Sequence, residues 1–249
     1  MTAASTKSFP EFSSLAVFSD AAVRDLAWAI GSPTLLDADH PAFSGRALGD
    51  AFFAARLAEA ENWLRDLDRA PEPLHHFIEA HHSHRLGHYF ETLIEFWLRH
   101  AGAADLRTRL HAGEAGHSVG EFDFVFRKEA WGGWLHWEAA VKFYLQAAPI
   151  AEWEHFIGPN PSDRLADKLR KLFDKQLALG STSAGHAALG TTISPGPRAV
   201  VKGYLFFPVG AKRPSVPGLS EHGLGGWWLR HGTSPLPAHH VAPRWKLLH

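Results

Sequence analysis

Residues 134–145 (WLHWEAAVKFYL) alternate in a pattern that strongly constrains the fold. Every second residue from Leu135 to Leu145 is apolar, and this predicts a strand with one face buried against a core. The opposite face is more polar and carries Trp134, His136, Glu138, Ala140, Lys142 and Tyr144. Such a strand needs partner strands along its edges and a covering layer over its apolar face.

A second alternating segment, residues 120–127 (GEFDFVFR), precedes this strand. Its alternation predicts Phe122, Phe124 and Phe126 on one face and Glu121, Asp123 and Val125 on the other. Residues 130–133 (AWGG) supply a turn, so the two segments predict a β-hairpin. Further ordered segments are predicted at residues 106–111, at 200–209 (VVKGYLFFPV) and at 225–230 (GGWWLR).

Helical periodicity flanks the predicted sheet on both sides. Helices are expected from Asp20 to Ile30, from Gly45 to Leu67, and from the Pro71–Pro73 break to about His100. A further helix is expected over residues 162–179, whereas the Gly-, Ser- and Thr-rich residues 180–198 predict a flexible loop. The succession of helix, mixed sheet, helix and strand predicts an α/β fold. We expect one domain over 1–249, with a loose tail at 1–10, a helical extension at 12–82, a core at 84–209 and an irregular segment at 210–249.

Composition removes several classes of function. The chain of 249 residues has no cysteine, which excludes disulfides, thiolate metal sites and cysteine nucleophiles. No apolar run is long enough to cross a membrane, and the first residues lack a signal-peptide pattern, so a cytoplasmic protein is expected. A net charge of −1 gives no overall basic field, so binding to nucleic acid would require a local basic patch. Phosphate-loop, dinucleotide-binding and serine-hydrolase motifs are absent from the sequence.

Acidic side chains gather at the polar face of the predicted hairpin. Asp123 can point to the same side as Glu138, and Glu91 borders the apolar stripe of the preceding helix. Clustered carboxylates repel one another unless a cation or a shared proton compensates, and Mg²⁺ takes oxygen ligands of this kind. The alternative is an ordinary ion pair of Lys142 with Glu138 or Asp123 on a solvated face, with Glu91 as a solvated glutamate.

This succession resembles the PD-(D/E)XK nuclease superfamily. The similarity covers G-x-x-F-E on a helix at residues 87–91, G-x-x-D at 120–123, and an acid and lysine on the next strand. Residues 24–36, 134–145 and 158–169 also resemble an uncharacterised bacterial family that is placed in this superfamily by remote similarity.

The resemblance implies a restriction-endonuclease-like core and hydrolysis of nucleic-acid phosphodiester bonds, with DNA as the expected partner. It implies Asp123, Glu138 and Glu91 as ligands of Mg²⁺ or Mn²⁺, and Asp123, Glu138 and Lys142 as the catalytic set. The superfamily pattern, however, places the acid two residues before the lysine, where this chain has Ala140. Glu138 lies about 7 Å further along the strand. A nucleic-acid-binding module that has lost catalysis on the same fold therefore remains an alternative.

Basic residues follow one face of the helix expected after the hairpin. This stripe consists of Arg164, Lys168, Lys171 and Lys175, and it is a candidate contact for nucleic-acid phosphates. A solvated face balanced by Asp167 and Asp174 is the alternative.

Six histidines gather between positions 75 and 88: His75, His76, His81, His82, His84 and His88. His84, His88 and Glu91 share a helical face whose spacing can bind a transition metal. Polar positions that flank a groove are the alternative interpretation of these histidines.

Overall fold

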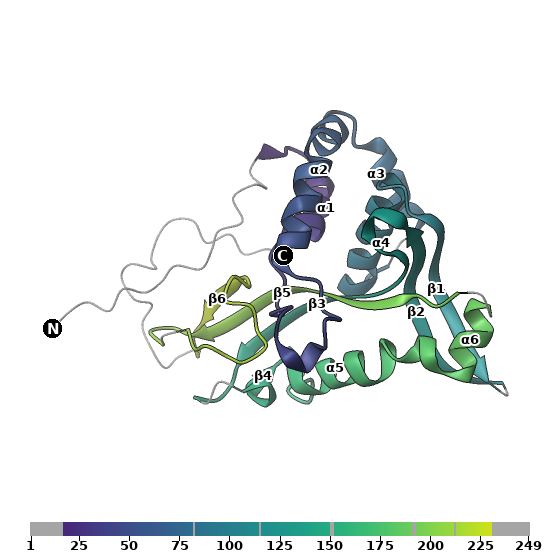
Figure 1. Cartoon of the computed structure of the whole chain (residues 1–249). Helices are drawn as coiled ribbons and strands as arrows, with labels where there is room; N and C mark the ends of the chain where they lie inside the picture. The colour runs from purple at the N-terminus through teal and green to yellow at the C-terminus, as the bar shows by residue number, and fades with distance from the viewer. Residues whose placement is uncertain are drawn as a thin grey trace.

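The computed structural model describes residues 17–81, 83–114, 116–149, 152–190, 193–211 and 213–230. Figure 1 shows a sheet with helices α1 to α4 on one side and helices α5 and α6 on the other. The tail expected at residues 1–10 and the end of the irregular segment, residues 231–249, lie outside the described residues. Within the described part of the chain, no helix combines the length and apolarity that a membrane span requires.

Four helices precede the sheet, as expected, although the helical stretch expected from Pro71–Pro73 to His100 is divided into two helices. They are α1 (Ala21–Gly31), α2 (Asp50–Arg69), α3 (Glu72–Ala80) and α4 (Leu86–His100). Asp20 caps the first of them, because its carboxylate accepts a hydrogen bond from the N–H of Val23 at 3.0 Å. Pro71 immediately precedes α3, as the predicted break required.

The sheet contains β1 (Ala104–Glu114), β2 (His117–Lys128), β3 (Gly133–Gln146), β4 (Phe156–Ile157), β5 (Gly196–Pro208) and β6 (Gly225–Trp228). Its strand order is β1-β2-β3-β5-β6, and the short β4 pairs with β3. The β1–β2, β2–β3 and β3–β4 pairs are antiparallel, whereas β5 runs parallel to both β3 and β6. The predicted mixed α/β fold is therefore confirmed, and each predicted strand is present.

Three apolar clusters cover the two faces of the sheet. On the α1–α4 side, the predicted apolar face of β3 is confirmed for its first half only. Leu135, Trp137 and Ala139 are buried against these helices, whereas Val141, Phe143 and Leu145 are half-buried. Trp137 stacks on Trp131 with ring centroids 5.6 Å apart and also contacts Trp97. On the other face, α5 packs against β5 through a separate core that contains Leu165, Leu169, Val201 and Leu205.

The prediction of a flexible loop over residues 180–198 is wrong. This region contains helix α6 (Ser183–Leu189), and β5 begins within it at Gly196. Thr182 caps α6 by accepting a hydrogen bond from the N–H of Gly185, and Ala184 and Leu189 are buried. A Cβ at position 185 would lie 1.9 Å from the carbonyl oxygen of Leu179, so the glycine allows a close approach rather than flexibility.

The helix expected over residues 162–179 is shorter and irregular. Helix α5 spans Leu165–Lys171 and continues as a π-helical turn over Leu172–Gln176. The N–H of Leu177 donates to the carbonyl of Leu172, five residues earlier, at 2.9 Å. The extra residue in this turn changes the direction of every side chain that follows, compared with a continuous α-helix.

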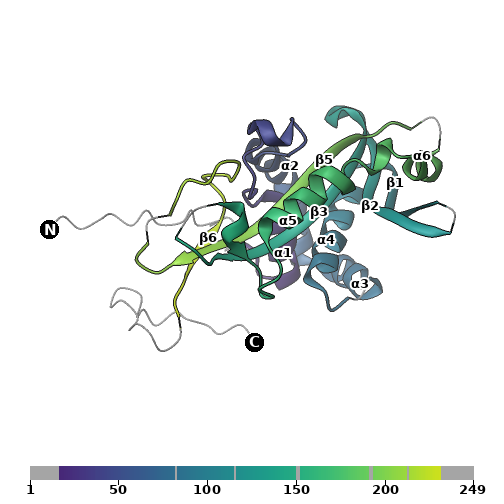
Figure 2. The same cartoon turned by 90° about the horizontal axis from the view of Figure 1, so that it is seen from below.

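The expectation that three phenylalanines share one face of β2 is also wrong. Phe124 and Phe126 belong to the core beneath α1, α2 and α4, whereas Phe122 packs against Leu179 and neighbours on the α6 side. The alternation is interrupted at Asp123, where β2 leaves β3. Figure 2 shows α5 lying across β3 and β5 on this side of the sheet.

Candidate active site

A gap opens between β2 and β3 at Asp123. The backbone ladder runs from Lys128, opposite Gly133, to Phe124, opposite Trp137. Beyond this pair the ladder stops, and the N–H of Ala139 donates at 2.9 Å to the carboxylate of Asp123 instead of to a backbone carbonyl. The N–H of Asp123 lies 3.4 Å from Oε1 of Glu138. The two strands are therefore joined here by acidic side chains, and the sheet edge beyond them is open.

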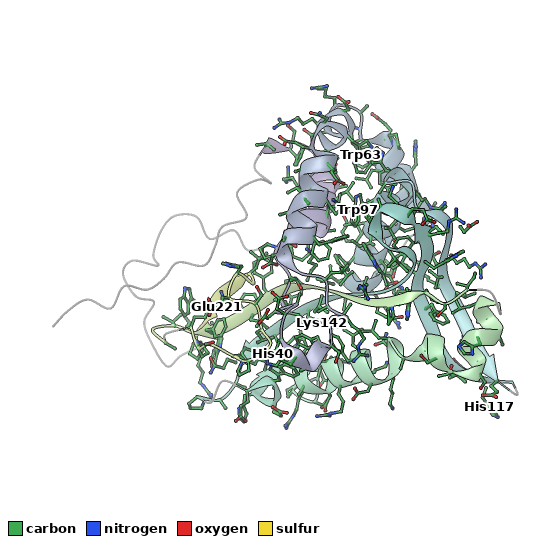
Figure 3. All side chains as sticks on the ribbon, in the orientation of Figure 1. His40, Trp63, Trp97, His117, Lys142 and Glu221 are labelled. Atoms are coloured by element: carbon green, nitrogen blue, oxygen red, sulfur yellow. The ribbon has the colours of Figure 1, made fainter. Side chains whose placement is uncertain are left out.

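The pocket at this gap has a volume of about 220 Å³ and collects most of the predicted site. Its wall includes Glu91 from α4, Asp123 from β2, and Glu138 and Lys142 from β3. The remaining lining residues are Gly87, Ala139, Ala140, Val141, Leu165, Lys168, Leu169, Lys171, Leu172, Gln176 and Val201. Figure 3 shows Lys142 between the sheet and α5, far from Trp97 in the helical layer.

Glu138 is completely buried and is held from both sides. Nε2 of His136 lies 2.7 Å from Oε1 of Glu138, and this histidine is 1% exposed. On the other side, Nε2 of Gln176 donates to Oε2 of Glu138 at 2.6 Å. Gln176 is the last residue of the π-helical turn, so the irregularity in the helix places this amide against the acid.

Burial and mutual repulsion raise the pKa values of the acids in this pocket. Burial, together with the nearby charges of Glu138 and Glu91, raises the pKa of Asp123 well above its usual value. Burial raises the pKa of Glu138 to about 8, although hydrogen bonds from Asp123 and Gln176 offset part of this effect. Burial also raises the pKa of Glu91.

The basic partners of these acids are driven toward their neutral forms. Burial lowers the pKa of His136 to about 4. We therefore place a neutral Glu138 carboxyl against a neutral His136 ring in the metal-free protein, because this arrangement avoids two buried charges. Burial and the neighbouring charge of Lys168 lower the pKa of Lys142.

The backbone of β3 is fixed at Lys142 by its parallel neighbour β5. Lys142 lies opposite Gly203, whose φ angle is +137°. A Cβ at position 203 would lie 1.8 Å from the carbonyl oxygen of Lys142. Only glycine allows the two strands to approach this closely, so Gly203 supports the position of the lysine.

Only two of the four residues in the predicted basic stripe lie at the pocket. Lys168 and Lys171 line it, whereas Arg164 precedes the first turn of α5 and Lys175 lies in the π-helical turn. All four side chains are exposed. Lys168 is also 3.5 Å from the carboxylate of Asp163.

The histidine-rich segment does not assemble a metal site among the described residues. His75 bonds Asp20 at 3.0 Å, and His81 lies 2.8 Å from the carbonyl of Phe77. His82 lies outside the described residues. In the part of the chain that is described, no group of three His, Asp or Glu side chains has the geometry of a metal-binding cluster. This finding covers His84, His88 and Glu91, and it also covers Glu91, Asp123 and Glu138.

The family model for a domain of unknown function (DUF1853) matches residues 24–249. The chain belongs to this family. No curated protein and no solved structure matches the chain. The family assignment covers the pocket residues and names no activity, so the chemistry of the family member described here rests on its own side chains.

The pocket of this family member offers oxygen donors that suit a divalent metal. Oε1 of Glu138 lies 3.4 Å from the backbone N of Asp123, and burial raises the pKa of both acids. Because the N–H of Ala139 faces β2, the backbone groups of Val141, two residues along, face the same open edge. A hard cation binds one or two carboxylates together with carbonyl and water oxygens, and this pocket supplies oxygen donors of those types.

Two residues that contact Glu138 escaped the sequence analysis as site residues. His136 was visible on the polar face of the strand, and its position two residues before Glu138 places it on the same side. Gln176 gave no signal, because its contact depends on the π-helical turn. Ala140 lines the pocket but brings no donor, and Glu138 reaches Asp123 from its displaced position.

Proposed function

We propose that this protein is a metal-dependent nuclease that hydrolyses phosphodiester bonds, with DNA as the expected substrate. The observation that supports this most is the joining of Glu91, Asp123, Glu138 and Lys142 in one pocket at the open end of β2 and β3. Lys168 and Lys171 border the same pocket and can contact substrate phosphates. We also propose the cytoplasm as the compartment, as expected from the sequence.

The chain's own groups suit the separate tasks of such a reaction. Mg²⁺ or Mn²⁺, when bound, would neutralise phosphate charge and acidify a water molecule. Asp123 and Glu138 would hold the cation, with Glu91 binding directly or through water. Lys142, whose pKa is lowered by burial, would orient the attacking water or stabilise the developing negative charge.

The resemblance of the sequence to the PD-(D/E)XK superfamily supports the same proposal, whereas the family model names only a domain of unknown function. The order of elements agrees with that resemblance: Glu91 is on a helix, Asp123 on the second strand, and Glu138 and Lys142 on the third. A helix and a parallel strand, α5 and β5, then follow. Ala140 and Glu138 line the same pocket, so Glu138 would supply the acid that position 140 lacks.

A nucleic-acid-binding module without catalysis is the second candidate. Both carboxylate oxygens of Glu138 already have protein partners, in His136 and Gln176. Position 140, where the superfamily pattern has its acid, supplies only a methyl group. In this case the protein would bind nucleic acid through Lys168 and Lys171 and leave it intact.

A cleavage panel separates the two candidates. Linear, circular and branched DNA are incubated with Mg²⁺ or Mn²⁺ and with the wild-type protein, Asp123→Asn or Glu121→Gln. Glu121 is the matched control, because it is an exposed acid on the same strand and does not line the pocket. We expect metal-dependent products from the wild type and Glu121→Gln and a loss of about a thousandfold or more in Asp123→Asn. DNA binding without cleavage in any metal would support the binding module, and equal cleavage by Asp123→Asn would exclude this pocket as the active site.

A further inference from the structure

Arg109, in the middle of β1, has a backbone conformation that strands rarely contain. Its φ angle is +50°, in the left-handed region that residues with a side chain adopt at a cost. The register on both sides is nevertheless undisturbed, with Thr108 opposite Phe124 and Leu110 opposite Phe122. Backbone strain of this kind persists only where surrounding structure imposes it, and it concentrates at functional sites.

The register places Arg109 next to the pocket. Between the two flanking pairs, the position opposite Arg109 is that of Asp123. Arg109 thus occupies the β1 side of the residue at which β2 separates from β3. The pocket and Arg109 share the same acidic helix, because α4 supplies Glu91 to both.

The guanidinium of Arg109 has charged neighbours and no hydrogen-bond partner among the described residues. Its Nε lies 3.7 Å from Oε2 of Glu91, and its Nη1 lies 3.6 Å from Oε2 of Glu95. Both distances exceed those of charge-assisted hydrogen bonds. By contrast, Arg99 bonds Glu95 at 2.7 Å. Because 33% of the Arg109 side chain is exposed, an incoming group can reach it.

We propose that Arg109 binds a phosphate of the nucleic acid, next to the phosphate that is held at Asp123. An arginine fork with unused N–H donors matches the oxygens of a phosphate. Lys168 and Lys171 lie on the α5 side of the sheet, and Arg109 lies on the α4 side. A nucleic-acid strand that crosses the gap at Asp123 would therefore meet positive charge on both sides. The inference rests on the substrate class of the proposed function but does not require cleavage.

Binding of a short labelled DNA, single-stranded and as duplex, tests the role of Arg109. Fluorescence anisotropy is measured over a series of salt concentrations with Ca²⁺ in place of Mg²⁺, so that a catalytic protein leaves the DNA intact. The variants are Arg109→Asn, which removes the charge while asparagine tolerates the left-handed conformation, and Arg109→Lys, which keeps the charge. Arg99→Gln is the matched control, because Arg99 bonds the same Glu95 from a more exposed position.

We expect Arg109→Asn to weaken DNA binding by about tenfold or more at low salt and to reduce the salt slope by about one. Arg109→Lys should keep the salt slope, and Arg99→Gln should resemble the wild type. Mn²⁺ affinity, measured separately by calorimetry, should not fall in Arg109→Asn. Unchanged DNA binding, or a loss that follows weaker Mn²⁺ binding, would overturn the inference and leave Arg109 as a support for Glu91.

The two proposals fail in different ways. DNA binding that depends on Arg109, without cleavage in any metal, would refute the nuclease and support the role of Arg109. Cleavage that requires Asp123 but is indifferent to Arg109 would do the reverse. A wild-type protein that binds no DNA would overturn both proposals.

Discussion

The two ends of the β2–β3 pair differ in almost every physical respect. From Phe124 to Lys128 the strands share a regular backbone ladder, and Trp137 packs there among Trp97, Trp131 and Phe126. From Asp123 onward the strands separate, and the contacts are made by buried carboxylates. The apolar, paired end stops at Phe124 and Trp137, and the acidic, open end begins at the next residue of each strand, Asp123 and Glu138.

This difference shows which end of the strand pair stabilises the fold and which end carries the reactive side chains. The paired end buries large aromatic surfaces, which is the main source of folding free energy. The open end buries acids next to one another, which costs folding free energy unless protons or a cation compensate. The paired end can therefore hold the strands in place while the open end retains groups that a stable core would exclude.

The largest expected effect is a difference in folding stability between substitutions at the two ends. Trp137→Ala should reduce the free energy of unfolding by about 3–5 kcal/mol, because it removes a buried indole from the aromatic cluster. Asp123→Asn should leave stability unchanged or raise it at neutral pH, because it removes an acid that is ionised in the unfolded chain and whose ionised form is disfavoured by burial in the fold. Urea denaturation in EDTA measures both changes. If Asp123→Asn destabilised the protein as strongly as Trp137→Ala, the division between the two ends would be wrong.

A smaller effect is expected from pH in the metal-free protein. The raised pKa of Glu138, about 8, means that the folded protein binds more protons than the unfolded chain above pH 4.5, so stability falls as pH rises toward 8. The lowered pKa of His136, about 4 against 6.5, has the opposite slope below pH 6.5. Together these two groups contribute a net fall between pH 6.5 and 8 on the order of 2 kcal/mol, whereas the lowered pKa of the buried Lys202 contributes a rise with pH.

Glu138→Gln provides the check on this pH dependence. The variant should lose most of the fall in stability between pH 6.5 and 8, leaving the share that Asp123 contributes with the same sign. Denaturant midpoints at a series of pH values measure it. The same slope over this range in the wild type and in Glu138→Gln would mean that Glu138 is ionised in the folded state at lower pH than we infer.

The smallest effect concerns the helix beside the open end. Replacing Lys168 and Lys171 by glutamine should weaken DNA binding and reduce the salt slope by up to about two, one for each phosphate contact. The matched control replaces Arg164 and Lys175, which carry the same charge on the same segment but do not line the pocket. Equal losses in both double variants would show a diffuse electrostatic effect rather than a groove beside the pocket.

The sequence predicted the strands and the grouping of acids because both depend on local alternation. Glu138 and Lys142 share a strand face by spacing alone, and the hairpin places Asp123 opposite Glu138. Glu91 was found from its place at the border of an apolar helical stripe, and the structure places it in the same pocket.

The remaining features depend on tertiary contacts that no local pattern records. Gln176 meets Glu138 only because a π-helical turn follows α5. Helix α6 was mistaken for a loop, since Gly185 is suited to close packing against Leu179 as well as to flexibility. The conformation of Arg109 is likewise invisible in a sequence where arginine in a strand is unremarkable.

Titration of the metal-free protein with Mn²⁺ in a calorimeter tests the central claim, that the open end of β2 and β3 is a divalent-metal site. We predict saturable binding by the wild type at pH 8, weaker binding at pH 6 because the acids must release protons, and no measurable binding by Asp123→Asn. Excess metal should also stabilise the wild-type fold by about 1–3 kcal/mol. Absence of Mn²⁺ binding to the wild type at either pH, or equal binding by Asp123→Asn, would contradict the account.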